Sequence, residues 1–534
     1  MSYVSWSFPL FTAAVILLYF FFPAKKHQWV VLLAASYIFY FYSGPGYGYL
    51  MLLTTLTTYG SARWIDRMGA RAEEIVAAHK SEWSREERKS FRADVKRRKK
   101  RVLTATLVPN FGILAFLKYY NFFAENLCVW GFSVPTMRLL LPLGISFYTF
   151  QSMGYLIDVY RGKCAAETNL GKVALFVSFF PQIVQGPIGM YGDLAHQLYE
   201  PHRFSYDRAR RGFQLIVWGY FKKLVIADRA VILVDAVTAS YTDYNGTAIL
   251  LAALFYALQL YADFSAGIDI SRGVAQILGI EMAQNFQRPY FSRSINEYWR
   301  RWHISLGAWM RDYVFYPLAT SKAFIQLGKR IRSARTEPSA ARVHIAKVLP
   351  TAFASLIVFL LVGIWHGANW KYVGFGVWNG GVIMLSVFFK PVYDALRERL
   401  RIRVESHGFA LFQMLRTFII VLIGYYFDIA PGFRAAMDMM RRSVFDQHLR
   451  EGIGQVLSAG LSLRQIIVLG YGAAVLFVVS LAQERLPESG LRARLEKTNA
   501  LIVWVLTYLC IASTLVFGMY GPGYNASAFV YMQF

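Results

Sequence analysis

The amino-acid sequence predicts an all-α integral membrane protein that crosses the bilayer many times, and three observations support this. Apolar residues make up 56% of the 534 residues, and the mean hydropathy is 0.35. These residues gather into long runs, as in helices that span a bilayer. Basic residues are concentrated in the segments between the runs, as expected for the loops of a membrane protein. We therefore expect about eleven crossings, with re-entrant and interfacial helices, around a central funnel.

The apolar runs are the predicted membrane helices. They cover residues 8–24, 28–43, 47–62, 102–123, 138–157, 173–190, 212–228, 247–264, 347–365, 372–389, 409–429, 465–482 and 500–519. Several runs fall short of the ~20 residues that a crossing needs, so some are expected to be re-entrant. The first run lacks a charged segment before it and a small-residue cleavage site after it, so it is predicted to be a retained helix and not a signal peptide.

Basic residues between the runs predict the orientation of the chain. Lys25 and Lys26 follow the first run, residues 63–101 end in KRRKKR, and residues 322–347 are rich in Lys and Arg. Basic segments of this kind remain on the cytoplasmic side. We therefore expect surface helices over 63–101 and a loop over 322–347 in the cytoplasm. The same count places the N-terminus and the C-terminal tail, residues 520–534, outside it.

The net charge of +25 allows two interpretations. A soluble protein with this charge would suggest nucleic acid, whereas basic loops of a membrane protein set topology and contact anionic lipid. We favour membrane lipid and predict no nucleic-acid partner. The three cysteines, Cys128, Cys164 and Cys510, are too scattered for a disulfide framework or a metal site. We expect no metal and no permanently bound cofactor.

One histidine lies inside a long apolar segment. His366 belongs to LVGIWHGANWKYVGFGVWNGG, residues 361–381, and the preceding run is predicted to carry it towards the outer half of the membrane. An ionisable side chain at membrane depth is costly, so it is by default a functional candidate that needs a partner.

A second histidine, His303, lies in NEYWRRWHISLGAWMRDYVFYP, residues 296–317. Helical spacing predicts one continuous helix here, with His303 at the edge of an apolar face. That face is formed by Trp299, Trp302, Leu306, Trp309 and Tyr313. The helix either lies at the interface or turns His303 into a cavity shared with His366. A neutral, buried imidazole can act as a general base on a hydroxyl, which suits acyl transfer.

Rival functions find little support in the residues. The sequence has no GxSxG, P-loop, HExxH or dinucleotide-binding motif, which leaves histidine-assisted transfer as the main candidate. A transporter or channel that exports polysaccharide or protons, with the histidines as a relay, would need several acids within its spans. The central runs hold few, mainly Asp158, Asp263 and Asp269.

The two histidine segments resemble the most diagnostic stretches of the membrane-bound O-acyltransferase family. The similarity is to its bacterial branch of alginate O-acetylases, peptidoglycan O-acetyltransferases and teichoic acid D-alanylation proteins. Residues 141–162, 179–189 and 261–273 support it, and one family domain over 1–534 is expected. The resemblance implies that His366 is the catalytic histidine and His303 the second histidine of the cavity. It assigns cavity or motif positions to Trp302, Trp365, Asn369, Trp370, Asn379, Asp263 and Ser265.

The resemblance also implies a reaction. A cytoplasmic thioester, acetyl-CoA or an acyl group on an acyl carrier protein, would supply an acyl group, with acetyl the first candidate. The acceptor would be a hydroxyl, for O-acetylation of an extracytoplasmic polysaccharide such as alginate, another exopolysaccharide or peptidoglycan, through an SGNH-type acetyltransferase partner. The location implied is the bacterial inner membrane. The alternative within the family is transfer of a longer acyl chain to a lipid or protein.

The tail carries a further hypothesis. FVYMQF, Phe529–Phe534, resembles a short C-terminal motif of the same branch, which implies that Tyr531 accepts the acyl group as a phenolic ester. The alternative is an aromatic anchor at the membrane interface.

Overall fold

The computed structural model describes residues 3–44, 48–139, 141–183, 185–333, 339–486, 499–521 and 529. Helices dominate these residues, and no strand occurs among them beyond an isolated antiparallel bridge between Phe286 and Trp302. The prediction of an all-α fold is confirmed.

The chain forms two compact units. Unit 1 comprises residues 1–213 and 271–283, and unit 2 comprises residues 214–270 and 284–534. A single family domain over 1–534 stays a prediction.

Unit 1 is built from the N-terminal helices. They are α1 (Ser7–Phe21), α2 (Gln28–Ser43), α3 (Gly48–Ala78), α4 (Arg85–Val129), α5 (Ile145–Arg161), α6 (Leu170–Ser178), α7 (Phe180–Ile183), α8 (Tyr191–Tyr199) and the first half of α9 (Tyr206–Tyr220). The C-terminal end of α11 (Gly246–Ile277) also belongs to this unit.

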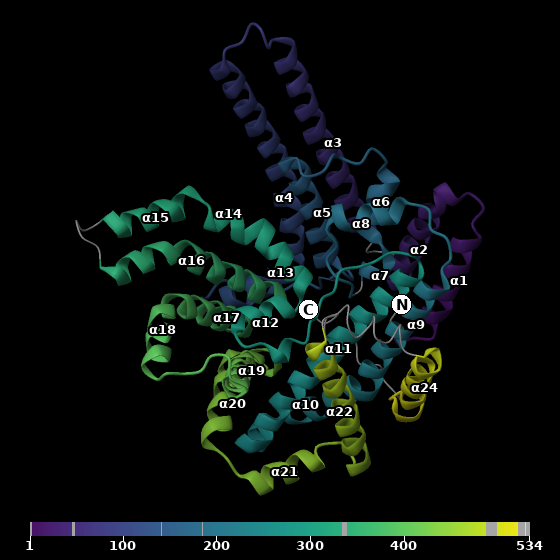
Figure 1. Cartoon of the computed structure of the whole chain (residues 1–534), viewed down its shortest axis with the longest axis vertical. Helices are drawn as coiled ribbons and strands as arrows, with labels where there is room; N and C mark the ends of the chain where they lie inside the picture. The colour runs from purple at the N-terminus through teal and green to yellow at the C-terminus, as the bar shows by residue number, and fades with distance from the viewer. Residues whose placement is uncertain are drawn as a thin grey trace. The chain divides into compact units, whose positions relative to one another are not determined.

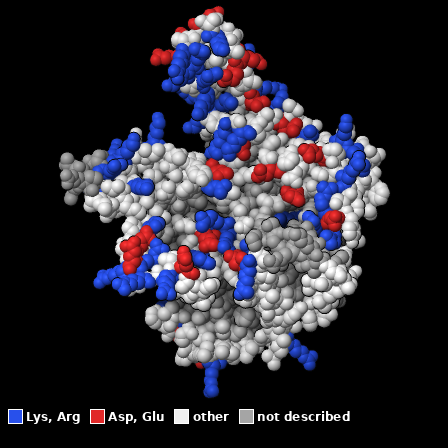
Figure 2. Space-filling model, viewed as in Figure 1, with Lys and Arg blue, Asp and Glu red and all other residues white. Residues whose placement is uncertain are grey.

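The charged segment 63–101 is largely helical, as predicted, but its helices are continuations of the apolar helices α3 and α4. α3 and α4 run side by side as a long hairpin (Figure 1), and the charged residues extend the two apolar helices. No proline interrupts the charged stretch, and Ser84 begins α4 with a capping box that includes Glu87. Figure 2 shows blue and red side chains intermingled over the hairpin. Its charge is therefore carried on continuous helices.

Unit 2 contains the remaining helices. They are the π-helical stretch η3 (Phe221–Ala227), α10 (Asp228–Ala239), most of α11, α12 (Ile295–Arg301), α13 (Ile304–Met310), the π-helical stretch η6 (Arg311–Phe315), α14 (Tyr316–Ala319), α15 (Lys322–Ser333), α16 (Ala340–His366), α17 (Trp370–Phe388), α18 (Lys390–Arg399), α19 (His407–Ile429), α20 (Phe433–Phe445), α21 (Leu449–Ser458), α22 (Leu463–Arg485) and α24 (Ala500–Phe517), with short 3-10 turns at Tyr241–Asp243 and Pro289–Phe291.

Five of the described helices are long and apolar enough to cross a membrane, and they are α4, α11, α16, α19 and α22. α17 and α18 meet at 59° and make a sixth if they count as one span. The protein is thus a multi-pass membrane protein, but the predicted count of about eleven is not confirmed. Some predicted runs form shorter helices, such as α1 with 15 residues, and the run 173–190 breaks between α6 and α7.

The basic segment 322–347 differs from the predicted loop. Its first part forms α15, and its last residues begin α16, whose first turn is capped by the side chain of Ser339. The basic residues of α15 alternate with apolar ones at helical spacing, which gives a helix with one apolar face. α15 packs along α16 (Figure 1).

The α16–α17 pair forms the framework of the site. A side chain added at Gly363 would lie 2.2 Å from the backbone oxygen of Tyr372, and one at Gly376 would lie 2.6 Å from the backbone oxygen of Phe359. Glycine at both positions lets the two backbones approach closely, as small residues do between membrane helices. α16 ends at His366, so this packing fixes the position of that histidine.

Candidate active site

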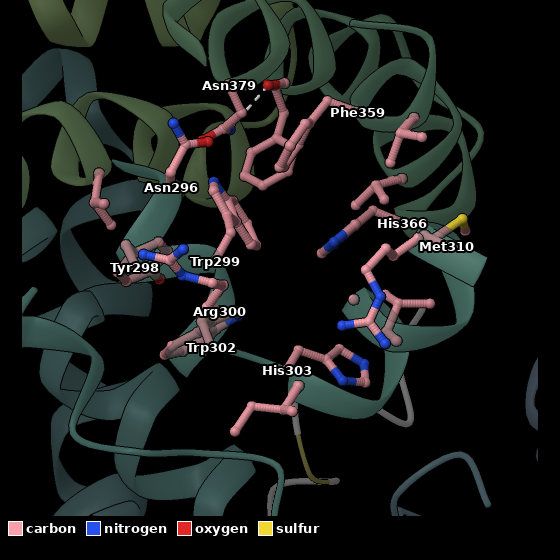
Figure 3. Close-up of a pocket in the computed structure, with 18 of the residues that line it drawn as sticks. Asn296, Tyr298, Trp299, Arg300, Trp302, His303, Met310, Phe359, His366 and Asn379 are labelled. Carbon is pink, nitrogen blue, oxygen red and sulfur yellow. Dashed lines mark hydrogen bonds between the residues drawn. The ribbon is translucent and has the colours of Figure 1, made fainter. Parts of the chain in front are cut away.

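Unit 2 encloses a cavity of ≈ 560 Å³, within the size range of small-molecule sites. Its walls come from α11, α12, α13, η6, α16, α17 and α19. Most of the lining is apolar or aromatic, and Figure 3 shows the polar groups that project among these rings. An aromatic cavity with few polar groups is what a small acyl-bearing substrate requires.

His366 points into this cavity and faces Trp299 across it (Figure 3). It is the last residue of α16 and is only partly buried. Its ring lies against Phe375 at 5.1 Å and Trp365 at 5.3 Å, measured between ring centroids. The surrounding rings pack against the imidazole, and the side chain lines the cavity.

His303 lines the same cavity, but not from a continuous helix. α12 ends at Arg301, Trp302 is extended, and His303 has a left-handed backbone with φ of 47°, after which α13 begins. The predicted single helix over 296–317 is therefore wrong. A positive φ in a non-glycine residue is sparsely populated and persists only where the surroundings impose it.

The loop at Asn285 imposes this break. Its side-chain oxygen accepts the backbone N–H of Ser305 at 2.8 Å, and its backbone oxygen accepts that of Ile304 at 3.0 Å. Asn285 therefore satisfies two of the unpaired N–H groups at the start of α13, as a capping residue does. The same side-chain oxygen lies 3.4 Å from Nδ1 of His303. The helical spacing of the tryptophans gave no sign of this distant partner.

An ion-pair network holds the other end of the break. Arg301 pairs with Glu297 and Glu484, and Arg288 also pairs with Glu484, at distances from 2.6 to 2.9 Å. This network connects α12 and the preceding loop to α22. Trp302 is thereby fixed in the cavity wall.

Aromatic rings enclose His303. Phe264 meets it edge to face with centroids 4.9 Å apart, and Trp365 lies at 6.0 Å. His303 is only 5% exposed and lies outside the helices long enough to span a membrane. Burial, and then the neighbouring His366, lower the pKa of His303 to about 3. Its imidazole is thus neutral at physiological pH and can accept or donate a hydrogen bond.

Three tyrosines that the sequence did not single out, Tyr256, Tyr298 and Tyr425, line another part of the cavity. The hydroxyl groups of Tyr298 and Tyr425 are 2.7 Å apart, and that of Tyr290 lies 3.0 Å from Tyr425. Tyr256 lines the cavity nearby, with its ring 5.5 Å from that of Tyr425. The chain has 34 tyrosines, and no motif distinguished these.

Asp428, also missed, brings a carboxylate to the cavity wall from the end of α19. Its Oδ1 is shielded from solvent and accepts no hydrogen bond from the described residues. Lys371 is close but donates to the backbone oxygens of Asp428 and Ala430, both at 2.8 Å. The carboxylate oxygen is therefore available to a ligand that can donate a hydrogen bond.

The residues assigned by resemblance differ in where they lie relative to the cavity. Trp302 and Asn379 line the cavity with the two histidines. Trp365 lies behind them, between the rings of His303 and His366. Asn369 caps α17, and Trp370 is 56% exposed, so neither lines the cavity.

Asp263 and Ser265 also lie outside the cavity lining, because they face a buried cluster of lysines. Lys223 lies 2.7 Å from Asp263, and Lys222 lies 2.6 Å from Ser265 and 2.7 Å from Asp269. A signal for this cluster exists in the sequence, because two lysines interrupt the apolar run 212–228.

Tyr531 lies outside the described residues. No group of three or more His, Cys, Asp or Glu side chains that could hold a metal occurs in the described part of the chain. The polar side chains that line the cavity include the two imidazoles, the Asp428 carboxylate, tyrosine hydroxyls, and the amides and guanidinium groups of Asn296, Asn379, Arg300 and Arg311.

Comparison with known proteins places this geometry in context. Residues 165–330 match the model of the membrane-bound O-acyltransferase family, a region that includes His303. A probable alginate O-acetylase of Azotobacter vinelandii is 30% identical over 459 residues, 84% of this chain and 80% of that protein. A peptidoglycan O-acetyltransferase of Helicobacter pylori is 30% identical over 308 residues, 53% of this chain and 54% of that protein. A teichoic acid D-alanyltransferase of Bacillus subtilis is 25% identical over 300 residues, 55% of this chain and 69% of that protein.

Proposed function

Because this chain belongs to the membrane-bound O-acyltransferase family and is an acyltransferase, we propose that its cavity transfers an acetyl group from a thioester to a hydroxyl. One observation carries the proposal: His366 and His303, 63 positions apart in the sequence, line one aromatic cavity. His366 projects into open space and acts as the base, while the neutral His303 orients or polarises the substrate.

The reaction balances with these two groups. His366 takes the proton of the acceptor hydroxyl as its oxygen attacks the thioester carbonyl carbon. The carbon–sulfur bond breaks, and the departing thiolate regains a proton from the imidazolium. The products are an ester and a free thiol, so no metal or redox step is needed.

The acceptor hydroxyl has a suitable partner in Asp428. We propose that the acceptor hydroxyl, or a second hydroxyl next to it on the acceptor, donates a hydrogen bond to Oδ1 of Asp428. This oxygen has no hydrogen-bond partner among the described residues. A hydrogen bond to a charged group contributes about 1.5–3 kcal/mol. Asp428 would thus select an acceptor rich in hydroxyl groups and orient it towards His366.

The donor and acceptor enter from opposite sides of the membrane in this proposal. A cytoplasmic thioester, acetyl-CoA or an acyl carrier protein, presents only its acyl end to the cavity, and the acceptor reaches it from outside. The charged phosphates of the donor then never cross hydrocarbon, which would be costly. The inner membrane, an outward N- and C-terminus and a central funnel belong to the same proposal.

The names of the similar proteins suggest the class of the acceptor. Those named as alginate O-acetylase and peptidoglycan O-acetyltransferase act on polysaccharides, so we propose an extracytoplasmic polysaccharide as the final acceptor. An extracytoplasmic SGNH-type acetyltransferase would complete the transfer, with Tyr531 as the intermediate carrier. Phe529, two positions before Tyr531, is fully buried in unit 2, and this burial supports the proposed role of Tyr531.

The test is incubation of the purified protein with acetyl-CoA, followed by mass spectrometry of the intact chain and its peptides. An acetyl group on Tyr531 that is lost in His366→Ala supports the proposal. Normal acetylation of the extracytoplasmic polysaccharide in cells that carry His366→Ala would refute it. Phe at position 531 tests the carrier separately, because retained polysaccharide acetylation in Tyr531→Phe would exclude that role alone.

The second candidate function is transfer of a longer acyl chain. The cavity of ≈ 560 Å³ has a limited volume, so donors of different chain length can be compared. Thermal unfolding with acetyl-CoA, octanoyl-CoA and palmitoyl-CoA compares the donors directly. Stabilisation by palmitoyl-CoA alone would point to a lipid or protein acceptor.

A further inference from the structure

The buried lysine cluster on η3 has no role in the reaction, although burying several charges is costly. Lys223 is 1% exposed, and its ammonium lies 2.7 Å from Asp263 and 3.0 Å from Asp228. Both carboxylates are 2% exposed. Charged groups at such depth are rare and usually mark a functional site.

The C-terminal segment of the chain contacts this cluster. The ring of Phe529 is fully buried, and its centroid lies 4.3 Å from Nζ of Lys223. An ammonium over an aromatic face is attracted by the electrons of the ring, and the attraction increases when water is excluded. Phe529 therefore adds an aromatic contact to an ammonium that the two carboxylates also contact.

A second contact joins the same segment to the same element. The backbone N–H of Met519, just after α24, donates to the backbone oxygen of Leu224 at 3.0 Å. Leu224 lies in η3, where the π-helical winding shifts the usual hydrogen bonds, and a guanidinium nitrogen of Arg229 also donates to Leu224 and Val225. π-helical stretches are frequent at functional sites. Here the altered winding provides a carbonyl for the C-terminal segment.

Aromatic packing supports these two contacts. Tyr471 of α22 lies 6.4 Å from Phe221 of η3 and 5.6 Å from Phe517 of α24, measured between centroids. The chain thus meets η3 at Met519 and again at Phe529, ten residues later.

We propose that η3, with Lys223 at its centre, is a binding site for the C-terminal segment of this same chain. Phe529 is the residue held, and the Asp263–Lys223–Asp228 cluster is buried because it forms the base of that site. The inference does not need the acyl-carrier role of Tyr531.

The location of the site also adds to the proposed function, and this connection to acyl transfer is the only part that rests on the proposed function. Asp263 directly precedes Phe264 on α11, and the ring of Phe264 packs against His303. Phe529 is therefore linked to the cavity wall through Lys223 and Asp263. Tyr531 follows Phe529 by two residues, at most about 7 Å of extended chain. Anchoring at Phe529 would keep the acyl-accepting tail beside the cavity between turnovers.

The experiment measures how accessible the tail is, and it requires neither donor nor acceptor. Cys128, Cys164 and Cys510 are replaced by alanine, a single thiol is introduced by Gln533→Cys, and the full-length protein in nanodiscs reacts with a polar maleimide. Phe529→Ala removes both burial and the ring, and it should raise the labelling rate at least tenfold. Phe529→Leu keeps an apolar side chain and should raise it about threefold, whereas Phe529→Trp should stay within twofold of the parent.

The matched control is Val516→Ala, because Val516 lies in the last turn of α24, just before the C-terminal segment, and is 72% exposed. It should leave the rate within twofold. An unchanged rate in Phe529→Ala would overturn the proposal, and equal rates for Leu and Trp would overturn the part assigned to Lys223. A tail that remains protected but never carries acetyl would refute the carrier and leave the binding site standing.

Discussion

Nδ1 of His303 lies 3.4 Å from Oδ1 of Asn285, an oxygen that also caps the helix after His303. One amide thus fixes both the backbone break and the orientation of the imidazole. Asn285→Ala should lower acyl transfer about tenfold and the free energy of unfolding by about 1–2 kcal/mol. Transfer rates and thermal unfolding in detergent measure the two effects. Gln287→Ala, in the same loop but without a contact to His303, should change neither, and a full-rate Asn285→Ala enzyme would contradict this role.

The burial of His303 predicts a pH dependence of stability. Its pKa of about 3 in the folded chain is below the value of about 6.5 expected after unfolding. Between these values the unfolded chain binds a proton that the folded chain does not, so stability decreases as the pH falls. From pH 7.5 to pH 5 this contribution amounts to about 2 kcal/mol.

His303→Gln removes that contribution and keeps a polar side chain. The difference in melting temperature between pH 7.5 and pH 5 should therefore be smaller in the variant than in the parent protein. The rest of the chain is identical in the two proteins, so the difference between their pH profiles reports on position 303. An equal decrease in both would show that His303 is protonated in the folded chain.

Asp428 should affect transfer to the acceptor and not the reactivity of the thioester. Asp428→Leu removes the oxygen that we assign to the acceptor, so transfer should fall about 10- to 100-fold. Slow hydrolysis of acetyl-CoA by water should persist, because it needs no bound acceptor. Asp428→Asn keeps an oxygen and should lose less.

Two assays separate these outcomes: acetyl groups on the acceptor and free thiol released. A parallel loss of both activities in Asp428→Leu would place Asp428 with the donor or with the fold of the cavity. The proposed hydroxyl contact would then be wrong.

The close approach of α16 to α17 predicts that alanine substitutions at two glycines, Gly363 and Gly381, differ markedly in their effect on stability. Gly363→Ala places a carbon 2.2 Å from the backbone of Tyr372, so the helices must separate and shift His366. The cost should be about 1–3 kcal/mol or more, with loss of activity. Gly381→Ala, on α17 with open space around it, should be neutral or slightly stabilising. Thermal unfolding of the two variants tests this, and equal melting temperatures would exclude a tight helix pair.

Much of the architecture was accessible from the sequence because it depends on local composition. Apolar runs predicted helices at α2, α16 and α19, since backbone groups in hydrocarbon must be paired within the segment. Polar residues before the helices, such as Ser339 and Asn369, carry ordinary capping signals. Continuation of α3 and α4 beyond their apolar runs was missed, because helices that leave the membrane need no apolar residues to continue.

The site was only partly accessible for a physical reason. Helical periodicity over 296–317 assumes one uninterrupted helix, and it cannot reveal that Asn285, a distant residue, caps a new helix within it. The role of Asp428 in the cavity wall was not visible in the sequence, because the cavity is formed by segments far apart along the chain. The contact of Lys223 with Asp263, 40 positions later, likewise depends on the fold.

By itself the sequence determined that His366 is an ionisable group in an apolar segment, and hence a functional candidate. Only the tertiary structure determined that His366 lies in the same cavity as His303. The left-handed backbone at His303 turns that residue into the cavity, and the glycines between α16 and α17 bring His366 to the same space. Composition and spacing act along the chain, whereas a shared cavity depends on contacts between segments that only the folded chain brings together.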